Sequence, residues 1–201
     1  MKKFIPVALC VALTACGGTR VVDLNDEQEV SSMQHVMELE YRDWTNTAEK
    51  MTESMIASGA LKTESKPVIA IGNIVNDTTQ RINSDMLTKK IRTTLLKSGK
   101  AQIATNFSGE DTTSDKVRTK RTDDEYDQKT IAQKGTLIAP NMSLSGKMLQ
   151  RNLKLESGWF SSVDTRVEYY LQLTLTDLKS GLSVWEDEQP IIKEGKDAPT
   201  W

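Results

Sequence analysis

The clearest hydrophobic pattern in the chain is a two-residue alternation between residues 166 and 176. The apolar positions are Val167, Tyr169, Leu171, Leu173 and Leu175, and mainly polar side chains stand between them. Successive side chains of a strand point to opposite faces of its sheet, so this pattern predicts a strand with one buried face and one face near water. Similar alternation over 142–149, and a turn at 179–181 followed by apolar positions in 182–188, predict the neighbouring strands.

A different spacing runs from residue 30 to residue 55, where apolar positions recur every three or four residues. They are Val30, Met33, Met37, Tyr41, Trp44, Ala48, Met51 and Met55. This period predicts one face of a helix. The segment forms either one long helix or two, with Asp43 as the N-cap of a second helix that begins at Trp44, and Gly59 is a natural stop.

Residues 68–75 are an almost unbroken apolar run of strand length, which predicts a central strand covered on both faces. Ser84 is a candidate N-cap for the next helix, which should end before Gly99. The apolar side of that helix is expected to hold Met86, Leu87, Ile91, Leu95 and Leu96. A short strand at 101–105 follows, so a βαβ unit is expected. The chain is therefore predicted to be α/β, as a small mixed sheet of about four to five strands flanked by helices.

Two connections lack an apolar period. Residues 106–127 carry a basic run at 116–121 and an acidic run at 123–125. We expect a solvated loop that leads into a helix at 123–134, because acidic residues suit a helix N-terminus. A nucleic-acid patch and a divalent-ion site are the alternatives for these charges. The second connection, residues 152–165, is predicted to be a hairpin loop that carries Trp159 and Phe160.

The N-terminal segment has the pattern of a secretory signal peptide. Two lysines precede a short apolar run over residues 4–13. This run is roughly half of the ~20 apolar residues that a transmembrane helix needs. The sequence Leu13-Thr14-Ala15-Cys16 then looks like a bacterial lipobox. That resemblance implies lipid transfer to the thiol of Cys16 and cleavage between Ala15 and Cys16.

Lipidation at Cys16 sets the expected organisation of the chain. Two or three acyl chains hold a protein firmly at a membrane surface. We expect a signal peptide at 1–15, a lipidated and partly helical tether at 16–40, a globular α/β domain at 41–193 and a tail at 194–201. The cysteine is followed by Gly17 rather than aspartate, which favours the outer membrane, on its periplasmic side.

Composition excludes several classes of function. The chain has 26 Lys and Arg and 28 Asp and Glu residues, and loss of two signal-peptide lysines changes its formal charge from −2 to −4. Such a chain has no electrostatic footprint for nucleic acid. Cys10 leaves with the signal peptide and Cys16 carries lipid, so His35, the single histidine, has no thiol or second imidazole with which to bind zinc. No Ser-x-x-Lys motif and no phosphate-binding glycine loop occurs. We therefore expect no catalysis, no cofactor and no metal.

Several segments together resemble a known family. The lipobox is followed by Tyr41-Arg42-Asp43-Trp44 at a helix start and by a strand that runs into Asn76-Asp77-Thr78-Thr79. Near the end, Asp177-Leu178-Lys179-Ser180-Gly181 precedes Val184-Trp185. Over residues 41–193 the chain resembles the penicillin-binding-protein activator lipoproteins, the LpoB family.

The resemblance implies a fold and a role. The fold would be related to the N-terminal domain of the TolB protein. The role would be that of an outer-membrane lipoprotein that docks on a class A penicillin-binding protein, a bifunctional peptidoglycan synthase of the inner membrane, and stimulates it. Aromatic side chains supply much of the energy of protein interfaces, so Trp159 and Phe160 are candidate partner-binding residues. The alternative is that these two side chains fold back and cap the sheet.

The sequence differs from the best-known family member in its tether, which is not long and proline-rich. About 25 residues separate Cys16 from Tyr41, and fully extended they reach at most roughly 80–90 Å. A similar strand pattern occurs in the CsgG family of curli-secretion lipoproteins, so an oligomeric secretion or surface-appendage component is the alternative function. Its membrane hairpins would need apolar strands of ~9–11 residues, and 106–127 and 152–165 are too polar for that. We expect a monomer.

Overall fold

The computed structural model describes residues 23, 26, 28–29, 36–107, 111–155 and 165–195. The chain divides into two compact units, 1–35 and 36–201, and each is described by itself. In the first unit, the side chain of Asp26 accepts hydrogen bonds from the backbone N–H groups of Gln28 and Glu29, which are helical. Within the described residues, no helix combines the length and the apolar character that membrane crossing requires.

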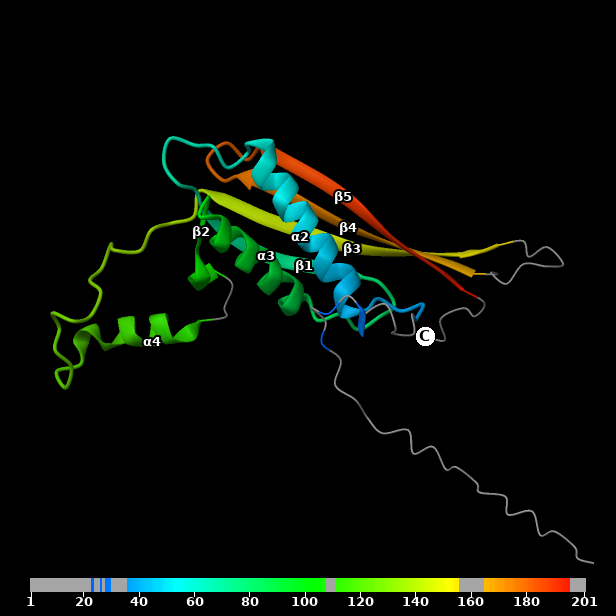
Figure 1. Cartoon of the computed structure of the whole chain (residues 1–201). Coiled ribbons are helices and arrows are strands. Elements are labelled where there is room, and N and C mark those ends of the chain that lie inside the picture. The colour runs from blue at the N-terminus through cyan, green and yellow to red at the C-terminus, as the bar shows by residue number, and fades with distance from the viewer. Residues whose placement is uncertain are drawn as a thin grey trace, which may run out of the picture. The chain divides into compact units, whose positions relative to one another are not determined.

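The second unit is built on a mixed five-stranded sheet with strand order β2-β1-β3-β4-β5 (Figure 1). β1 (Val68–Asp77) pairs in parallel with β2 (Gln102–Ile103) and with β3 (Met142–Lys154). β4 (Thr165–Asp177) is antiparallel to both β3 and β5 (Ser183–Gly195). The sheet and its helices confirm the predicted fold class. β5 continues through Gly195, which is two residues into the segment predicted to be the tail.

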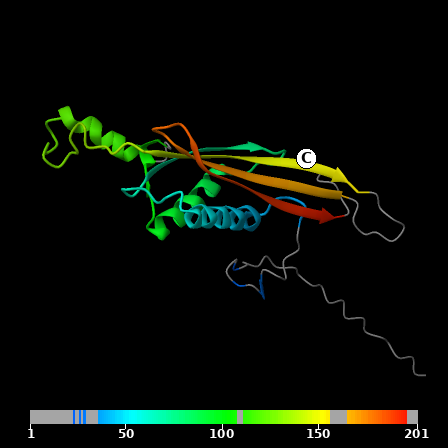
Figure 2. The same ribbon diagram turned by 90° about the horizontal axis from the view of Figure 1, so that it is seen from above.

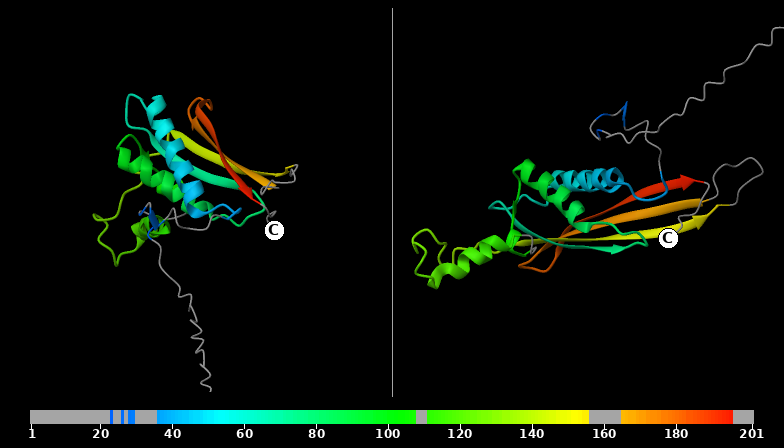
Figure 3. Two further views of the ribbon diagram at one scale, coloured as in Figure 1. Left: turned by 45° about the vertical axis from the view of Figure 1, so that its right-hand side comes forward. Right: turned by 90° about the horizontal axis from the view of Figure 1, so that it is seen from below.

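Two helices, α2 (Tyr41–Ser58) and α3 (Ser84–Ser98), lie side by side on one face of the sheet (Figures 2 and 3). The core between the helices and the sheet contains Trp44, Ala48, Met51 and Met55 from α2, Leu87, Ile91 and Leu95 from α3, and alternate side chains of β1, β3 and β4. The predicted alternation on β4 is confirmed, since Val167, Tyr169, Leu171, Leu173 and Leu175 are all buried. No described helix covers the second face of the sheet, so β1 is central but is not covered on both faces as predicted, and Val75 is exposed.

The helix boundaries differ slightly from those predicted. α2 begins at Tyr41 with Glu40 as its N-cap, and Asp43 is the third residue of the helix, where its carboxylate accepts the backbone N–H of Glu40. Residues 36–40 are not helical, and the rest of the predicted helix, 30–35, lies outside the described residues. α3 is capped by Asn83 rather than Ser84. Gly59 and Gly99 end the two helices at φ values of 86° and 66°, in the left-handed region that favours glycine.

A close approach between β3 and β4 fixes one further glycine. β1 has a bulge between Ile71 and Ile74, opposite Ser145 of β3. Gly146 follows, and a Cβ added there would lie 2.6 Å from the backbone oxygen of Gln172 and 2.6 Å from a methyl group of Leu173. A side chain at Gly146 would therefore push two paired strands apart.

The polar segment between β2 and β3, residues 104–141, is called the excursion here. Its structure differs from the one predicted. Its helices are η1 (Thr105–Phe107), α4 (Thr112–Thr119) and η2 (Lys120–Thr122), and the helix expected at 123–134 is absent. The carboxylates of Asp123 and Asp127 each accept a backbone N–H two residues later. Such local bonds compete with helix formation, which explains the wrong prediction. The excursion lies beyond the end of the sheet where β3 begins (Figures 1 and 3).

Candidate functional site

The described part of the chain offers little for catalysis. Among these residues, no group of three or more His, Cys, Asp or Glu side chains could hold a metal ion. His35 lies outside the described residues, as do Ala15, Cys16, Trp159 and Phe160, so the predicted lipidation and partner-binding residues have no structural description here. Exposed apolar surface is the other kind of candidate site, because a contiguous apolar patch often marks where a partner binds.

Three helical side chains that the periodicity placed on the core side are exposed, and one of them is Leu96 of α3, at 51%. Tyr41 of α2 and Met86 of α3 keep 45% and 46% of their surface in water. Both lie at the edge of their helical stripes: in α3 the buried positions are Leu87, Ile91 and Leu95, and Met86 is about 100° around the helix from Leu87. In both helices the apolar stripe is wider than the part that the core buries. This extra width was the signal in the sequence for an exposed apolar surface, but the prediction assigned the edges of the stripes to the core.

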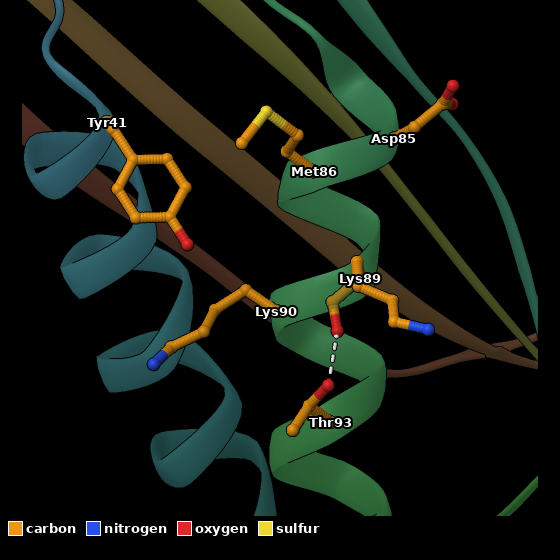
Figure 4. A pocket seen from close by; sticks show the side chains of 6 residues that line it. All are labelled: Tyr41, Asp85, Met86, Lys89, Lys90 and Thr93. Carbon is orange, nitrogen blue, oxygen red and sulfur yellow. Dashed lines mark hydrogen bonds between the residues drawn. The ribbon is translucent and has the colours of Figure 1, made fainter.

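The exposed edges face each other across a groove between α2 and α3, which we call the interhelical groove. Its first hollow has a volume of about 490 Å³ and is lined by Tyr41, Asp85, Met86, Lys89, Lys90 and Thr93. Figure 4 shows Tyr41, Met86 and Lys90 directed toward the space between the helices, and Asp85 and Lys89 directed away from α2. The ring of Tyr41 is held from behind by an edge-to-face contact with Trp44, at 5.0 Å between ring centroids.

A second hollow of about 450 Å³ continues the groove toward the other ends of the helices. Its lining residues are Glu49, Glu53, Ile56, Ala57, Thr94, Lys97 and Ser98. Between the two hollows, Lys90 Nζ lies 2.9 Å from a carboxylate oxygen of Glu49 and so joins α2 to α3 across the groove. The groove thus has an apolar floor at each end and a single ionic bridge between the ends.

The two sides of the groove, called the α2 bank and the α3 bank after the helices that form them, carry opposite charge. The α3 bank has Lys89, Lys90 and Lys97 together with one acid, Asp85, whereas the α2 bank has Glu49 and Glu53. Of the charges that line the groove, only Lys90 and Glu49 form an ion pair with a described residue, and Lys89, Lys97 and Glu53 are exposed. This arrangement suits recognition of another polypeptide better than binding of a small molecule, because both hollows are shallow and open.

A second feature is the junction segment, residues 36–40, which leads into α2. Its backbone is held by side chains from elsewhere in the unit: the Leu39 N–H donates to Gln80 Oε1 at 3.0 Å, and the Met37 carbonyl accepts from the Tyr169 hydroxyl at 3.2 Å. The Gln80 amide in turn donates to the Tyr169 hydroxyl oxygen. Long-range hydrogen bonds of this kind are invisible in a local pattern, which is why the helix was predicted to run through these residues.

Burial dominates the electrostatics of the junction segment. Burial, followed by the nearby carboxylates of Glu38 and Asp43, raises the pKa of Tyr169 to about 12. The hydroxyl therefore stays protonated and can donate to Met37 at any physiological pH. On the other side of the junction, Lys193 of β5 lies 2.5 Å from Asp43 and 3.6 Å from Glu40, with only 11% of its side chain exposed.

The charged runs of the excursion are mostly used inside the excursion. Arg121 donates to the backbone carbonyls of Ala132 and Gln133, and Lys120 forms an ion pair of 2.9 Å with Asp123. The hydrogen bond from Lys120 lowers the pKa of Asp123. The basic run 116–121 therefore lies on α4 and η2 rather than in the predicted solvated loop, and its printed contacts stay within the excursion.

Comparison with known proteins gives one family. A family model described as peptidoglycan-synthase activator LpoB matches residues 43–191. A search of curated proteins returns no match.

Solved structures of the same family are among the structural matches. The LpoB C-terminal domain from Escherichia coli is 13% identical, with a TM-score of 0.44, over 74% of this chain and 98% of that one. The corresponding domain from Salmonella enterica is 14% identical, with a TM-score of 0.45, over the same shares. The NMR structure of LpoB from E. coli is 11% identical, with a TM-score of 0.38, over 94% of this chain and 90% of that one.

Proposed function

The chain belongs to the peptidoglycan-synthase activator LpoB family, and on this premise we propose that it binds and stimulates a class A penicillin-binding protein. The family match over residues 43–191 is the observation that carries the proposal, because it spans both helices and nearly the whole sheet. The family role is regulatory, so in this proposal the chain acts by contact with the synthase. In this proposal a bifunctional synthase makes and cross-links glycan strands, and the bound activator raises its rate.

The proposal includes a lipid anchor on Cys16 in the outer membrane, with the protein facing the periplasm. It is supported by the Leu13-Thr14-Ala15-Cys16 sequence and by the outer-membrane lipoprotein character of the family. Fractionation of cells that express the Cys16→Ser variant tests this part. The native protein should sediment with the outer membrane, and the variant should remain in the soluble periplasmic fraction or with an uncleaved signal peptide. An unchanged distribution would contradict the anchor.

Trp159 and Phe160 are proposed as partner contacts on the loop between β3 and β4. The pair lies between Leu155 and Thr165 in the sequence, in the connection between the antiparallel strands β3 and β4. Alanine at both positions should weaken synthase binding without lowering the melting temperature. A loss of stability of several degrees would instead mean that the two side chains cover apolar surface of the sheet.

The partner is tested by photocrosslinking in cells that produce the lipid-anchored full chain, followed by identification of the captured protein. We expect a class A penicillin-binding protein. Capture of copies of the same chain, together with a ring-sized particle on size-exclusion chromatography, would favour the secretion-component alternative. A monomer that captures no synthase would refute the proposed partner.

A further inference from the structure

We propose that the interhelical groove is the docking surface for the synthase and that it receives an amphipathic helix of that partner. This inference rests on the proposed function and adds where contact occurs and which chemistry makes it. The helix would carry apolar anchors for the two hollows, acidic side chains along the flank beside α3 and basic side chains along the flank beside α2.

Tyr41 and Met86 supply the apolar surface of the first hollow. Each exposes nearly half of its surface, 45% and 46%, although each stands on a stripe that continues into the core. Figure 4 shows the two side chains directed into the same space from different helices. Ile56 supplies an apolar side chain in the second hollow. An apolar anchor of a partner would remove this surface from water at both ends of the groove.

The charged side chains of the two banks also fit such a helix. Lys89 and Lys97 on α3 have no carboxylate within ion-pair distance among the described residues, and the same part of the chain offers no cation to Glu53 on α2. Opposite charges on the two banks select a partner that is acidic on one flank and basic on the other. Charge complementarity of this kind fixes orientation and speeds association more than it adds affinity.

The shape of the groove selects a helix rather than an extended segment. Both walls are α-helices whose backbone N–H and C=O groups are already bonded within each helix. An extended segment would find no strand edge to pair with and would bury unpaired backbone groups, whereas a helix satisfies its own. From Tyr41 to Ala57 the groove follows α2 for 16 residues, so a helix of about 24 Å would fill it.

Matched variants on α3 test the surface. Met86→Ser removes an apolar side chain of the groove, and Leu96→Ser removes one of similar exposure, 51%, that lines neither hollow. Lys97→Glu reverses a charge of the α3 bank, and Lys100→Glu reverses an exposed charge just beyond it. Binding of the purified full chain to detergent-solubilised synthase is the measurement. The groove variants should each lower affinity roughly ten-fold, as central interface positions do, and the controls should stay within about two-fold.

The outcomes separate this inference from the proposed function. If wild-type protein stimulates the synthase and the groove variants bind as the controls do, the groove is not the docking surface and the function stands. If wild-type protein neither binds nor stimulates any class A synthase, the proposed function itself fails.

A photocrosslinking residue at position 86, and separately at position 56, tests the shape of the partner. Attachment to one face of a helix in the synthase is expected. Attachment to a strand of the synthase, or to a second copy of this chain, would overturn the proposal.

Discussion

Hydrogen bonds from Gln80 and Tyr169 hold the junction segment, and their contribution to the free energy of unfolding can be worked out. Tyr169→Phe keeps the buried ring and removes only the hydroxyl, which accepts from Gln80 and donates to the Met37 carbonyl. Each of these hydrogen bonds contributes ~0.5–1.5 kcal/mol, so the loss should be about 1–3 kcal/mol. For a domain of this size, at roughly 2–4 °C per kcal/mol, that corresponds to a fall in Tm of roughly 2–12 °C.

Tyr170→Phe is the matched control for this variant. Tyr170 is the next residue on β4, it points to the uncovered face of the sheet, and its hydroxyl donates to Glu168 at 2.7 Å. It is more exposed than Tyr169 and holds no segment of backbone. We expect the control to cost about 1.5–3 kcal/mol, since its one hydrogen bond is made to a carboxylate, and to leave the junction segment unchanged.

Thermal unfolding followed by circular dichroism measures the stabilities, and hydrogen exchange localises the effect. In Tyr169→Phe the Leu39 amide should lose protection, because the Gln80 side chain that accepts its N–H is no longer held. Exchange at β4 should change only as much as global stability does. A Leu39 amide that keeps its protection in Tyr169→Phe, or that loses as much protection in Tyr170→Phe, would refute the account of the junction.

The same hydroxyl predicts a dependence on alkaline pH. The folded pKa of Tyr169 is raised from 10.0 to about 12, so the folded state favours the protonated phenol. Its contribution to stability is fully present below pH 10 and is lost as the pH rises through 12. The stability difference between wild type and Tyr169→Phe should therefore shrink over this range. Urea unfolding of both proteins at pH 9 and above measures it, and a difference that stays constant would contradict the raised pKa.

Two further variants test how the sheet and the helices are joined. Gly146→Ala should destabilise the domain by about 1–3 kcal/mol or more, since the new methyl group meets a Gln172 backbone oxygen at 2.6 Å, whereas Gly72→Ala on β1 meets its neighbour at an ordinary 3.5 Å and should cost less in urea unfolding. Lys193→Met should cost roughly 2 kcal/mol, because it leaves the partly buried carboxylate of Asp43 without its cation. Restoration of most of that loss by adding Asp43→Asn would confirm the pair, and an undiminished loss would contradict it.

Much of the fold could be predicted from local patterns. The two-residue alternation predicted both the strand β4 and its buried face. The three- to four-residue spacing predicted the helix α2 and its buried face, at Trp44, Ala48, Met51 and Met55. Burial on one side imposes these periods directly. The strand order could not be read in this way, because pairing of β1 with β3 joins residues 72 or 73 positions apart. The prediction for the excursion was wrong for another reason. The carboxylates of Asp123 and Asp127 accept backbone hydrogen bonds, and these bonds replace the helix that composition favoured.

The candidate site was only half visible in the sequence. Tyr41 and Met86 were recognised as members of helical stripes and were assigned to the core. The groove exists because α2 and α3 lie side by side and leave the edges of both stripes uncovered. Which edge is uncovered depends on the distance and rotation between two helices, and no single-helix pattern contains that information. The charges of the banks were likewise unremarkable until α2 and α3 were seen together.

Stimulation of a synthase by this chain can be measured as the rate of glycan polymerisation by a purified class A penicillin-binding protein. The mature chain with Cys16→Ser, which needs no lipid to stay in solution, is added to the synthase and its lipid-linked disaccharide substrate. The account predicts a saturable rise in rate that follows the concentration of the added protein. An unchanged rate at concentrations where binding would be complete, for every class A synthase of the same cell, would contradict it.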